Sequence, residues 1–220
     1  MKLIVMLTHN DQTVKDALET FRSVKDLPVQ DWGFKNIGLP VPQMKELVAE
    51  MKAAQKTTYL EVVTYTEHEC AEAAKLAVEC KFDKLCGTKY FPSVMDAVND
   101  KIDYYPFCGK VWGNPSVLGG EIDEIIEHAN ELHTLGAKGC DLLAYRYTGD
   151  AEKLLRIYLE KVHTPTIVAG SIGSYQRLDL MCVLNPYAIT MGSALFTRNF
   201  EKEGSFRDNL AKVVDYLDSK

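Results

Sequence analysis

The feature that most constrains the fold is a regular alternation of short apolar segments with longer amphipathic ones. Eight segments rich in aliphatic, β-branched or aromatic residues have the length and composition of strands. We predict strands over residues 3–7, 31–39, 57–66, 83–91, 103–113, 140–150, 166–169 and 188–190. An amphipathic segment follows each strand, and we predict helices over residues 12–24, 44–51, 67–80, 93–98, 121–135, 151–161, 175–184 and 207–217.

This order of elements predicts an α/β fold with a parallel sheet, because each helix provides the crossover between two strands. A length of 220 residues is close to that of a compact barrel, and no linker or low-complexity segment divides the chain. We therefore predict one domain over residues 1–220, a (β/α)8 TIM barrel. The alternative is an open flavodoxin-like sheet, which usually has fewer strands.

Two turns of small residues follow the last two predicted strands. The first turn spans residues 170–174 and the second spans residues 192–194. Small residues let backbone N–H groups approach an anion, and the loops after strands 7 and 8 of such barrels commonly bind phosphate. The predicted substrate-binding residues in these turns are Gly170, Ser171, Gly173, Ser174, Gly192 and Ser193. Alternatively, the two segments are ordinary strand-to-helix turns.

These turns resemble those of the ribulose-phosphate-binding barrel superfamily, which typically read "AGGI" and "GSA". The matching residues are Ala169, Gly170, Ile172, Gly192, Ser193 and Ala194. Ser171 stands where the superfamily usually has a second glycine. The specific resemblance covers about thirty residues, and it implies a phosphate-binding barrel similar to phosphosugar epimerases, decarboxylases and aldolases.

Charged residues within the predicted strands are the catalytic candidates. They are Lys35, Glu61, Lys89 and Lys110. A barrel strand is buried on both faces, so a charge in the middle of a strand is costly unless it meets a partner or a ligand. We predict that these residues form a cluster of net positive charge, which lowers the pKa of one lysine or holds a keto group, carboxylate or phosphate. The alternative is a buried ion network that only fills the mouth of the barrel.

Three further residues are weaker candidates for contact with a substrate. Arg146 and Tyr147 belong to the sixth predicted strand, and His9 follows the first strand. Strand alternation could also place Arg146 or Tyr147 outward, and His9 could belong to an exposed turn. Residues 114–120 have the length and glycine content of a mobile lid, or they form an ordinary loop.

Charge and cysteine use limit the partners and the compartment. The net charge of −6 argues against nucleic acid and anionic membranes, so a local positive site must hold any anionic substrate. The apolar segments are too short for a signal peptide or a membrane span, and the six cysteines are scattered. We expect a cytoplasmic protein with free thiols. We expect no metal and no cofactor, and homo-oligomerisation is possible by analogy with other barrels.

Together these features predict an enzyme that acts on a small phosphorylated sugar or keto acid. In one version, Glu61 is the base that removes a proton next to a carbonyl and a lysine stabilises the enolate oxygen. In the other, Lys89 or Lys110 forms a Schiff base, as in an aldolase. The residues leave aldolase, decarboxylase, epimerase and isomerase chemistry open. The alternative is a non-catalytic barrel that binds a phosphorylated metabolite and regulates another process.

Overall fold

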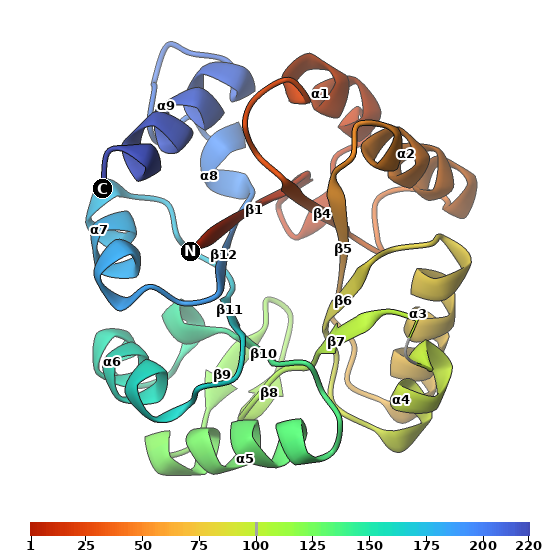
Figure 1. Cartoon of the computed structure of the whole chain (residues 1–220), viewed down its shortest axis with the longest axis vertical. Coiled ribbons are helices and arrows are strands. Elements are labelled where there is room, and N and C mark those ends of the chain that lie inside the picture. Colours follow the sequence, from red (N-terminus) through yellow and green to blue (C-terminus); the bar gives the residue numbers. More distant parts are fainter. Residues whose placement is uncertain (100) are drawn as a thin grey trace.

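The computed structural model describes residues 1–99 and 101–220, and over these residues it has eight parallel strands arranged in a ring (Figure 1). The strands follow the order β10-β11-β12-β1-β4-β5-β6-β7 in the sheet. Their bounds are β1 Lys2–Met6, β4 Asp31–Lys35, β5 Thr57–Val62, β6 Lys84–Gly87, β7 Asp103–Tyr105, β10 Cys140–Leu142, β11 Thr166–Val168 and β12 Ala188–Met191.

Backbone contacts between β7 and β10 nearly close this ring. The amide of Lys138 donates to the carbonyl of Tyr104 at 2.9 Å, and the amide of Asp141 donates to the carbonyl of Pro106 at 2.9 Å. Phe107 and Asp141 form a parallel bridge beyond the end of β7. The predicted (β/α)8 barrel is therefore confirmed, and the open flavodoxin-like alternative is wrong because the two outer strands meet.

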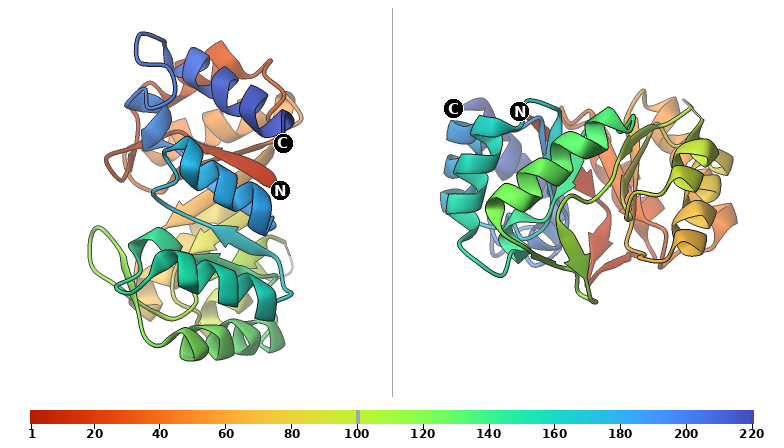
Figure 2. Two further views of the ribbon diagram at one scale, coloured as in Figure 1. Left: turned by 90° about the vertical axis from the view of Figure 1, so that its left-hand side faces the viewer. Right: turned by 90° about the horizontal axis from the view of Figure 1, so that it is seen from below.

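The helices cover the outside of the barrel, and Figure 2 shows two side views of this layer. Their bounds are α1 Ala17–Val24, α2 Val41–Ala53, α3 Glu67–Glu79, α4 Pro92–Val98, α5 Ile122–Thr134, α6 Ala151–Lys161, α7 Tyr175–Leu184, α8 Ser193–Phe196 and α9 Phe206–Asp218. Their buried apolar faces pack against the outward side chains of the strands in one large core. No helix in the described ranges is both long and apolar enough to cross a membrane.

A second, smaller core fills the interior of the ring. It consists of Ile4, Met6, Tyr59, Cys86, Tyr105, Ile167 and Ala188. Alternate residues of a strand face opposite sides, so the residue two positions after Tyr59, which is Glu61, also points inward. The interior is therefore apolar in its middle layer and polar at the carboxyl ends of the strands.

The fifth predicted strand, 103–113, is wrong in its extent. The barrel strand β7 ends at Tyr105, and the chain then leaves the ring to form an antiparallel hairpin of β8 (Lys110–Trp112) and β9 (Val117–Gly119). Pro106 cannot donate a ladder hydrogen bond, and Gly109 has a φ of 78°, which turns the chain outward. Figure 2 shows this hairpin at the end of the barrel away from the chain termini.

Two other predicted boundaries are wrong for related reasons. Residues 12–13 pair with residues 8–9 as the small hairpin of β2 (Thr8–His9) and β3 (Gln12–Thr13), so α1 begins only at Ala17. After β10, residues 144–146 form the short 3-10 helix η1, Ala144–Arg146, instead of continuing the strand predicted over 140–150. In both places a short local element follows directly after a barrel strand.

Candidate active site

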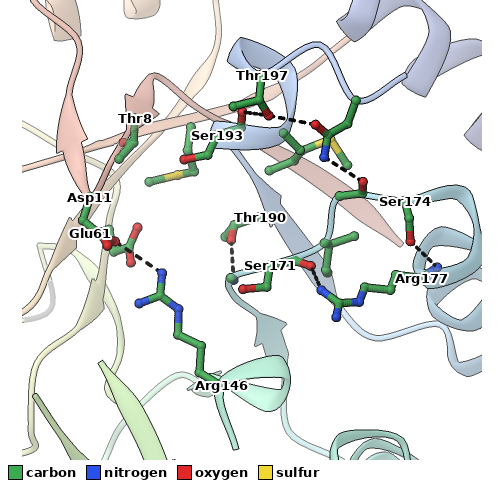
Figure 3. A pocket seen from close by; sticks show the side chains of 18 of the residues that line it. Thr8, Asp11, Glu61, Arg146, Ser171, Ser174, Arg177, Thr190, Ser193 and Thr197 are labelled. Carbon is green, nitrogen blue, oxygen red and sulfur yellow. Dashed lines mark hydrogen bonds and ion pairs between the residues drawn. The ribbon is translucent and has the colours of Figure 1, made fainter. Parts of the chain in front are cut away.

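The two small-residue turns meet at one side of a cavity of about 610 Å³ at the carboxyl ends of the strands. A Cβ atom added to Gly173 would lie only 3.1 Å from the Cβ of Ala194 in the second turn. The amide of Gly170 donates to Oγ1 of Thr190 on β12 at 3.3 Å, which links the first turn to the neighbouring strand. Figure 3 shows both turns facing the same cavity.

The first turn has a backbone conformation that favours glycine. Gly170 has a φ of 81°, and Ser171 follows with a φ of 60°. The Arg177 side chain supports this turn, because its guanidinium donates to the carbonyl of Ser171 and lies 4.2 Å from the ring centre of Tyr145. Ser174 caps α7 by accepting from the amide of Arg177 at 3.3 Å. Arg177 therefore places a positive charge beside the turn, on the wall of the cavity.

On the other side of the cavity, four charged side chains form a connected group. Nζ of Lys35 lies 2.9 Å from Oδ1 of Asp11 and 3.6 Å from Oε1 of Glu61. The guanidinium of Arg146 reaches across to the same Asp11 oxygen at 3.3 Å, as Figure 3 shows. The side chains of Lys35 and Glu61 are only 7% and 15% exposed. Two cations and two carboxylates thus leave this group without net charge.

The surroundings of Lys35 keep it protonated. Burial by itself lowers the pKa of Lys35, but the carboxylates of Glu61 and Asp11 outweigh burial and raise the pKa above its ordinary value. For Asp11, burial raises the pKa, but Lys35 and Arg146 outweigh it and lower the pKa. The expectation that a positive cluster lowers the pKa of a lysine is therefore wrong for Lys35, because its nearest neighbours are acids.

Asp141 on β10 is a further acidic group inside the barrel. It is 1% exposed, and its Oδ1 atom has no hydrogen-bond partner among residues 1–99 and 101–220. Burial, with the charge of Glu61 as the next contribution, raises the pKa of Asp141 well above its ordinary value. Asp141 therefore holds its proton to a higher pH than an ordinary aspartate does.

Two of the four predicted catalytic residues lie outside this cavity. Lys110 is in the β8–β9 hairpin instead of a barrel strand, and its ammonium pairs with Glu124 of α5 at 2.8 Å with 68% of the side chain exposed. Lys89 is exposed in the segment after β6, with its ammonium 5.6 Å from the ring centre of Tyr65. The predicted cluster of three lysines and one glutamate is therefore reduced to Lys35 and Glu61.

The weaker candidates divide in a similar way. Arg146 lines the cavity, whereas His9 and Tyr147 do not. His9 is half-buried and packs its ring 5.8 Å from that of Phe196, and the hydroxyl of Tyr147 donates to the carbonyl of Gly120 at 2.9 Å. Both side chains thus make contacts within the protein outside the cavity.

The segment predicted as a lid or an ordinary loop, 114–120, is held in place. Residues 117–119 form β9, and the hydroxyl of Tyr65 donates to the carbonyl of Gly113 at 2.8 Å. The same hydroxyl lies 2.7 Å from Oγ of Ser116. With these contacts the segment lies near the mouth of the barrel, beside Asp11 and Lys35.

Sequence reasoning missed three residues that shape the site: Asp11, Asp141 and Arg177. Asp141 lies between Cys140 and Leu142 in a predicted strand, the same pattern that identified Glu61, so it could have been found. Asp11 and Arg177 had no such alternating pattern around them, because Asp11 lies in a predicted turn and Arg177 lies in a predicted helix. Over the described residues, no group of three or more His, Cys, Asp or Glu side chains could hold a metal ion.

The barrel and its paired turns define the class of fold, a (β/α)8 barrel, and solved enzymes named for phosphorylated compounds are among the structures to which this fold is similar, as the resemblance of the turns predicted. No protein-family model and no curated protein sequence matches the chain.

Among solved structures, the chain is similar to orotidine 5'-phosphate decarboxylase from Pyrococcus horikoshii OT3, with a TM-score of 0.67, 9% identity, and 98% and 99% of the two chains covered. It is similar to 3-hexulose-6-phosphate synthase from Salmonella typhimurium, with a TM-score of 0.67, 15% identity, and 100% and 99% covered. A third similar structure is the glycerol uptake operon antiterminator regulatory protein from Listeria monocytogenes, with a TM-score of 0.60, 15% identity, and 88% and 92% covered. At these identities the likeness establishes the fold alone.

Proposed function

We propose that this protein is an enzyme that binds a small phosphorylated sugar and transfers a proton next to its carbonyl group. One observation carries the proposal: the two small-residue turns and the buried Lys35–Glu61 pair line the same cavity. An anchor for an anion and an acid–base pair within one cavity are the parts that such a reaction needs. The phosphorylated compounds named in two similar structures agree with this proposal.

The phosphate group binds at the turns in this proposal. Residues 170–174 and 192–194 offer backbone amides, and Arg177 adds a guanidinium on the same wall. Backbone amides and arginine are the donors that proteins commonly use for phosphate. Ser171 also contributes a hydroxyl where the superfamily usually has only a glycine.

Glu61 is the base in this proposal, and the ammonium of Lys35 stabilises the negative charge that develops on the carbonyl oxygen. A lysine with a raised pKa is a good hydrogen-bond donor and a poor nucleophile, because it lacks a free electron pair. Lys89 and Lys110 are exposed and lie outside the cavity. The site therefore supports acid–base chemistry better than a Schiff-base aldolase.

The charges in the cavity favour a neutral sugar over a keto acid. Lys35 and Arg146 are already balanced by Asp11 and Glu61, so a second anionic group on the ligand would find no free cation in this group. Among the described residues that line the cavity, only Arg177, beside the turns, adds an unbalanced positive charge, and the phosphate needs that charge. A phosphorylated ketose or aldose fits this distribution.

A thermal-shift screen tests the binding part of this proposal. The folded protein is incubated with phosphorylated ketoses and aldoses, with the same sugars lacking phosphate, and with phosphorylated keto acids. A ligand at 100 times its dissociation constant adds about 2.7 kcal/mol of stability. We expect stabilisation by phosphorylated sugars only. Equal responses to both forms of a sugar would contradict a phosphate site.

Once a sugar that the protein converts has been found, Glu61→Gln tests the catalytic part of the proposal. Gln keeps the size of the side chain and removes the base, so turnover falls by about 10²–10⁴-fold. Affinity for the phosphorylated sugar stays within a few-fold, because the turns are unchanged. Borohydride trapping with mass spectrometry provides an independent check, and a lysine adduct would contradict the acid–base mechanism.

The second candidate function is a regulatory barrel that binds a phosphorylated metabolite without catalysis. The ion pairs of Lys35 and Arg146 favour it, because a closed network is stable without a substrate, and one similar structure is named as a regulatory protein. This function predicts thermal stabilisation by a phosphorylated sugar, no turnover of it, and no change in the ligand after long incubation.

A further inference from the structure

Below the large cavity, Asp141 lines a second, small cavity of about 10 Å³. The two cavities share Met6, Glu61 and Thr190. Asp141 is almost fully buried, and its Oδ1 atom has no hydrogen-bond partner in the described part of the chain. A buried polar atom without a partner is costly, so this position calls for an explanation.

The groups around Asp141 come from β4, β5, β6, β12, η1 and the segment after β7. Lys35 on β4, Glu61 on β5 and Arg146 on η1 act on its carboxyl group through charge, and the thiol of Cys108 also contributes. The hydroxyl of Tyr59 on β5, the thiol of Cys86 on β6 and the hydroxyl of Thr190 on β12 line the same small cavity. Burial raises the pKa values of Tyr59, Cys86 and Cys108, so these three groups are neutral at neutral pH.

A second negative charge at Asp141 would therefore have no cation of its own. Lys35 is already 2.9 Å from Asp11 and 3.6 Å from Glu61, and Arg146 is paired with Asp11. Two carboxylates that share one buried site lose their protons in separate steps, because the first negative charge raises the pKa of the second carboxyl, as the acid dyads of other enzymes illustrate. The fully buried member keeps the proton, and the member beside the lysine keeps the charge.

We propose that Asp141 and Glu61 form a carboxyl pair that carries one proton and one negative charge, with the proton on Asp141. In this pair Asp141 is a positioning residue: while neutral, it leaves Glu61 charged next to Lys35. The pair releases its protons in two steps, and the proton on Asp141 leaves in the step at higher pH. The proposed role of Glu61 as a base rests on the proposed function, whereas the proton on Asp141 does not.

Carbon-13 NMR of protein labelled at aspartate carboxyl carbons tests the position of the proton directly. The Asp141 signal is assigned by its loss in Asp141→Asn. We expect the chemical shift of a protonated carboxyl at pH 7 in the unmodified protein. In Glu61→Gln the Asp141 carboxyl loses its proton at a lower pH, because the negative charge of Glu61 is gone.

Thermal unfolding as a function of pH provides a second readout. The unfolded chain releases the Asp141 proton near pH 4 while the folded chain keeps it, so this group makes the folded state less stable as pH rises. Asn resembles the neutral acid and has no such proton. The measured quantity is the difference between the Tm of Asp141→Asn and the Tm of the unmodified protein. We expect this difference to increase by at least about 2 °C from pH 5 to pH 8.

Asp31→Asn is the matched control at the opposite end of the barrel. Asp31 is also buried, at 3% exposure, but it accepts from the Tyr59 hydroxyl at 2.7 Å and lies 3.7 Å from Lys2. Asn cannot form the ion pair with Lys2, so Asp31→Asn lowers the Tm at pH 7.

An ionised Asp141 signal at pH 7, or parallel Tm curves for Asp141→Asn and the unmodified protein, would overturn the proposal. If Asp141→Asn does not fold, the NMR titration of Glu61→Gln still decides the matter without that assignment: the pair is removed if no aspartate carboxyl that is protonated at pH 7 in the unmodified protein titrates at a lower pH in Glu61→Gln. Failure of all phosphorylated sugars to bind would refute the proposed function and leave these titrations intact. The two ideas can thus fail separately.

Discussion

At the scale of single residues, the site contains a serine in a conformation that favours glycine. Ser171 has a φ of 60°, and the guanidinium of Arg177 donates to its carbonyl. The left-handed conformation costs an L-residue about 1–2 kcal/mol. The chain thus tolerates local strain where the first turn faces the cavity, as functional sites often do.

Ser171→Gly is predicted to stabilise the protein by a few tenths to about 1 kcal/mol. Glycine relieves the strain of the left-handed conformation, and this gain exceeds the extra conformational entropy that glycine loses on folding, which costs about 0.5–1 kcal/mol. The urea midpoint of unfolding measures the effect. Ser174→Gly, three residues further on, is the control: it removes the cap of α7 and costs a few tenths of a kcal/mol. Destabilisation by Ser171→Gly would show that its hydroxyl or Cβ contributes to the fold.

At the scale of elements, α7 contributes to the site through its first turn. Arg177 folds back from this helix onto the turn formed by residues 170–174, and its ring contact with Tyr145 connects η1 to the same place. The connection between β11 and α7 thereby supplies the amide-rich turn, and α7 itself supplies a cation. Neither part alone would neutralise a phosphate in a protein of net charge −6.

Arg177→Ala is predicted to weaken binding of a phosphorylated sugar by about 10-fold or more, since a hydrogen bond to a charged group contributes about 1.5–3 kcal/mol. Isothermal titration calorimetry with a ligand from the thermal-shift screen measures it. Arg156→Ala on the exposed face of α6 serves as the control and leaves the affinity unchanged. Equal affinities of all three proteins would place the phosphate away from the first turn.

At the scale of the whole molecule, ion pairs connect helices that are distant in the chain. Arg207 at the start of α9 donates two hydrogen bonds to Asp26, at 2.7 and 2.6 Å, just after the end of α1. Its guanidinium also donates to the carbonyl of Ser23 at 2.6 Å. These contacts hold the last helix against the first one on the outside of the barrel (Figure 1).

This pair predicts a stability difference that depends on pH. The hydrogen bond from Arg207 lowers the pKa of Asp26 to about 2, so its contribution is present above the ordinary aspartate pKa and is lost as pH falls toward 2. Asp26→Asn therefore lowers the Tm at pH 7, and the difference disappears near pH 2. Asp96→Asn is the control, because the Asp96 carboxylate has no ion pair within residues 1–99 and 101–220. A difference that is independent of pH would exclude this ion pair as the cause.

The sequence by itself determined the class of fold, and it predicted the two small-residue turns that line the cavity. Eight strand–helix units require parallel strands, and apolar alternation around Glu61 decided that this side chain faces inward. The glycines and serines of the two turns are local signals, because backbone conformation and close approach depend on residue size at those positions. These features are properties of neighbouring residues, so they can be predicted from the order of the residues.

Only the tertiary structure decided which charges meet. Lys110 and Lys35 look alike as lysines within β-like segments, but Pro106 and Gly109 divert the chain and carry Lys110 to the exterior. Asp11 joins Lys35 because the β2–β3 hairpin folds over the barrel mouth. The pKa values of Lys35 and Asp141 both depend on Glu61, which is distant from each of them in the chain, because electrostatic energy depends on distance in space, not in sequence.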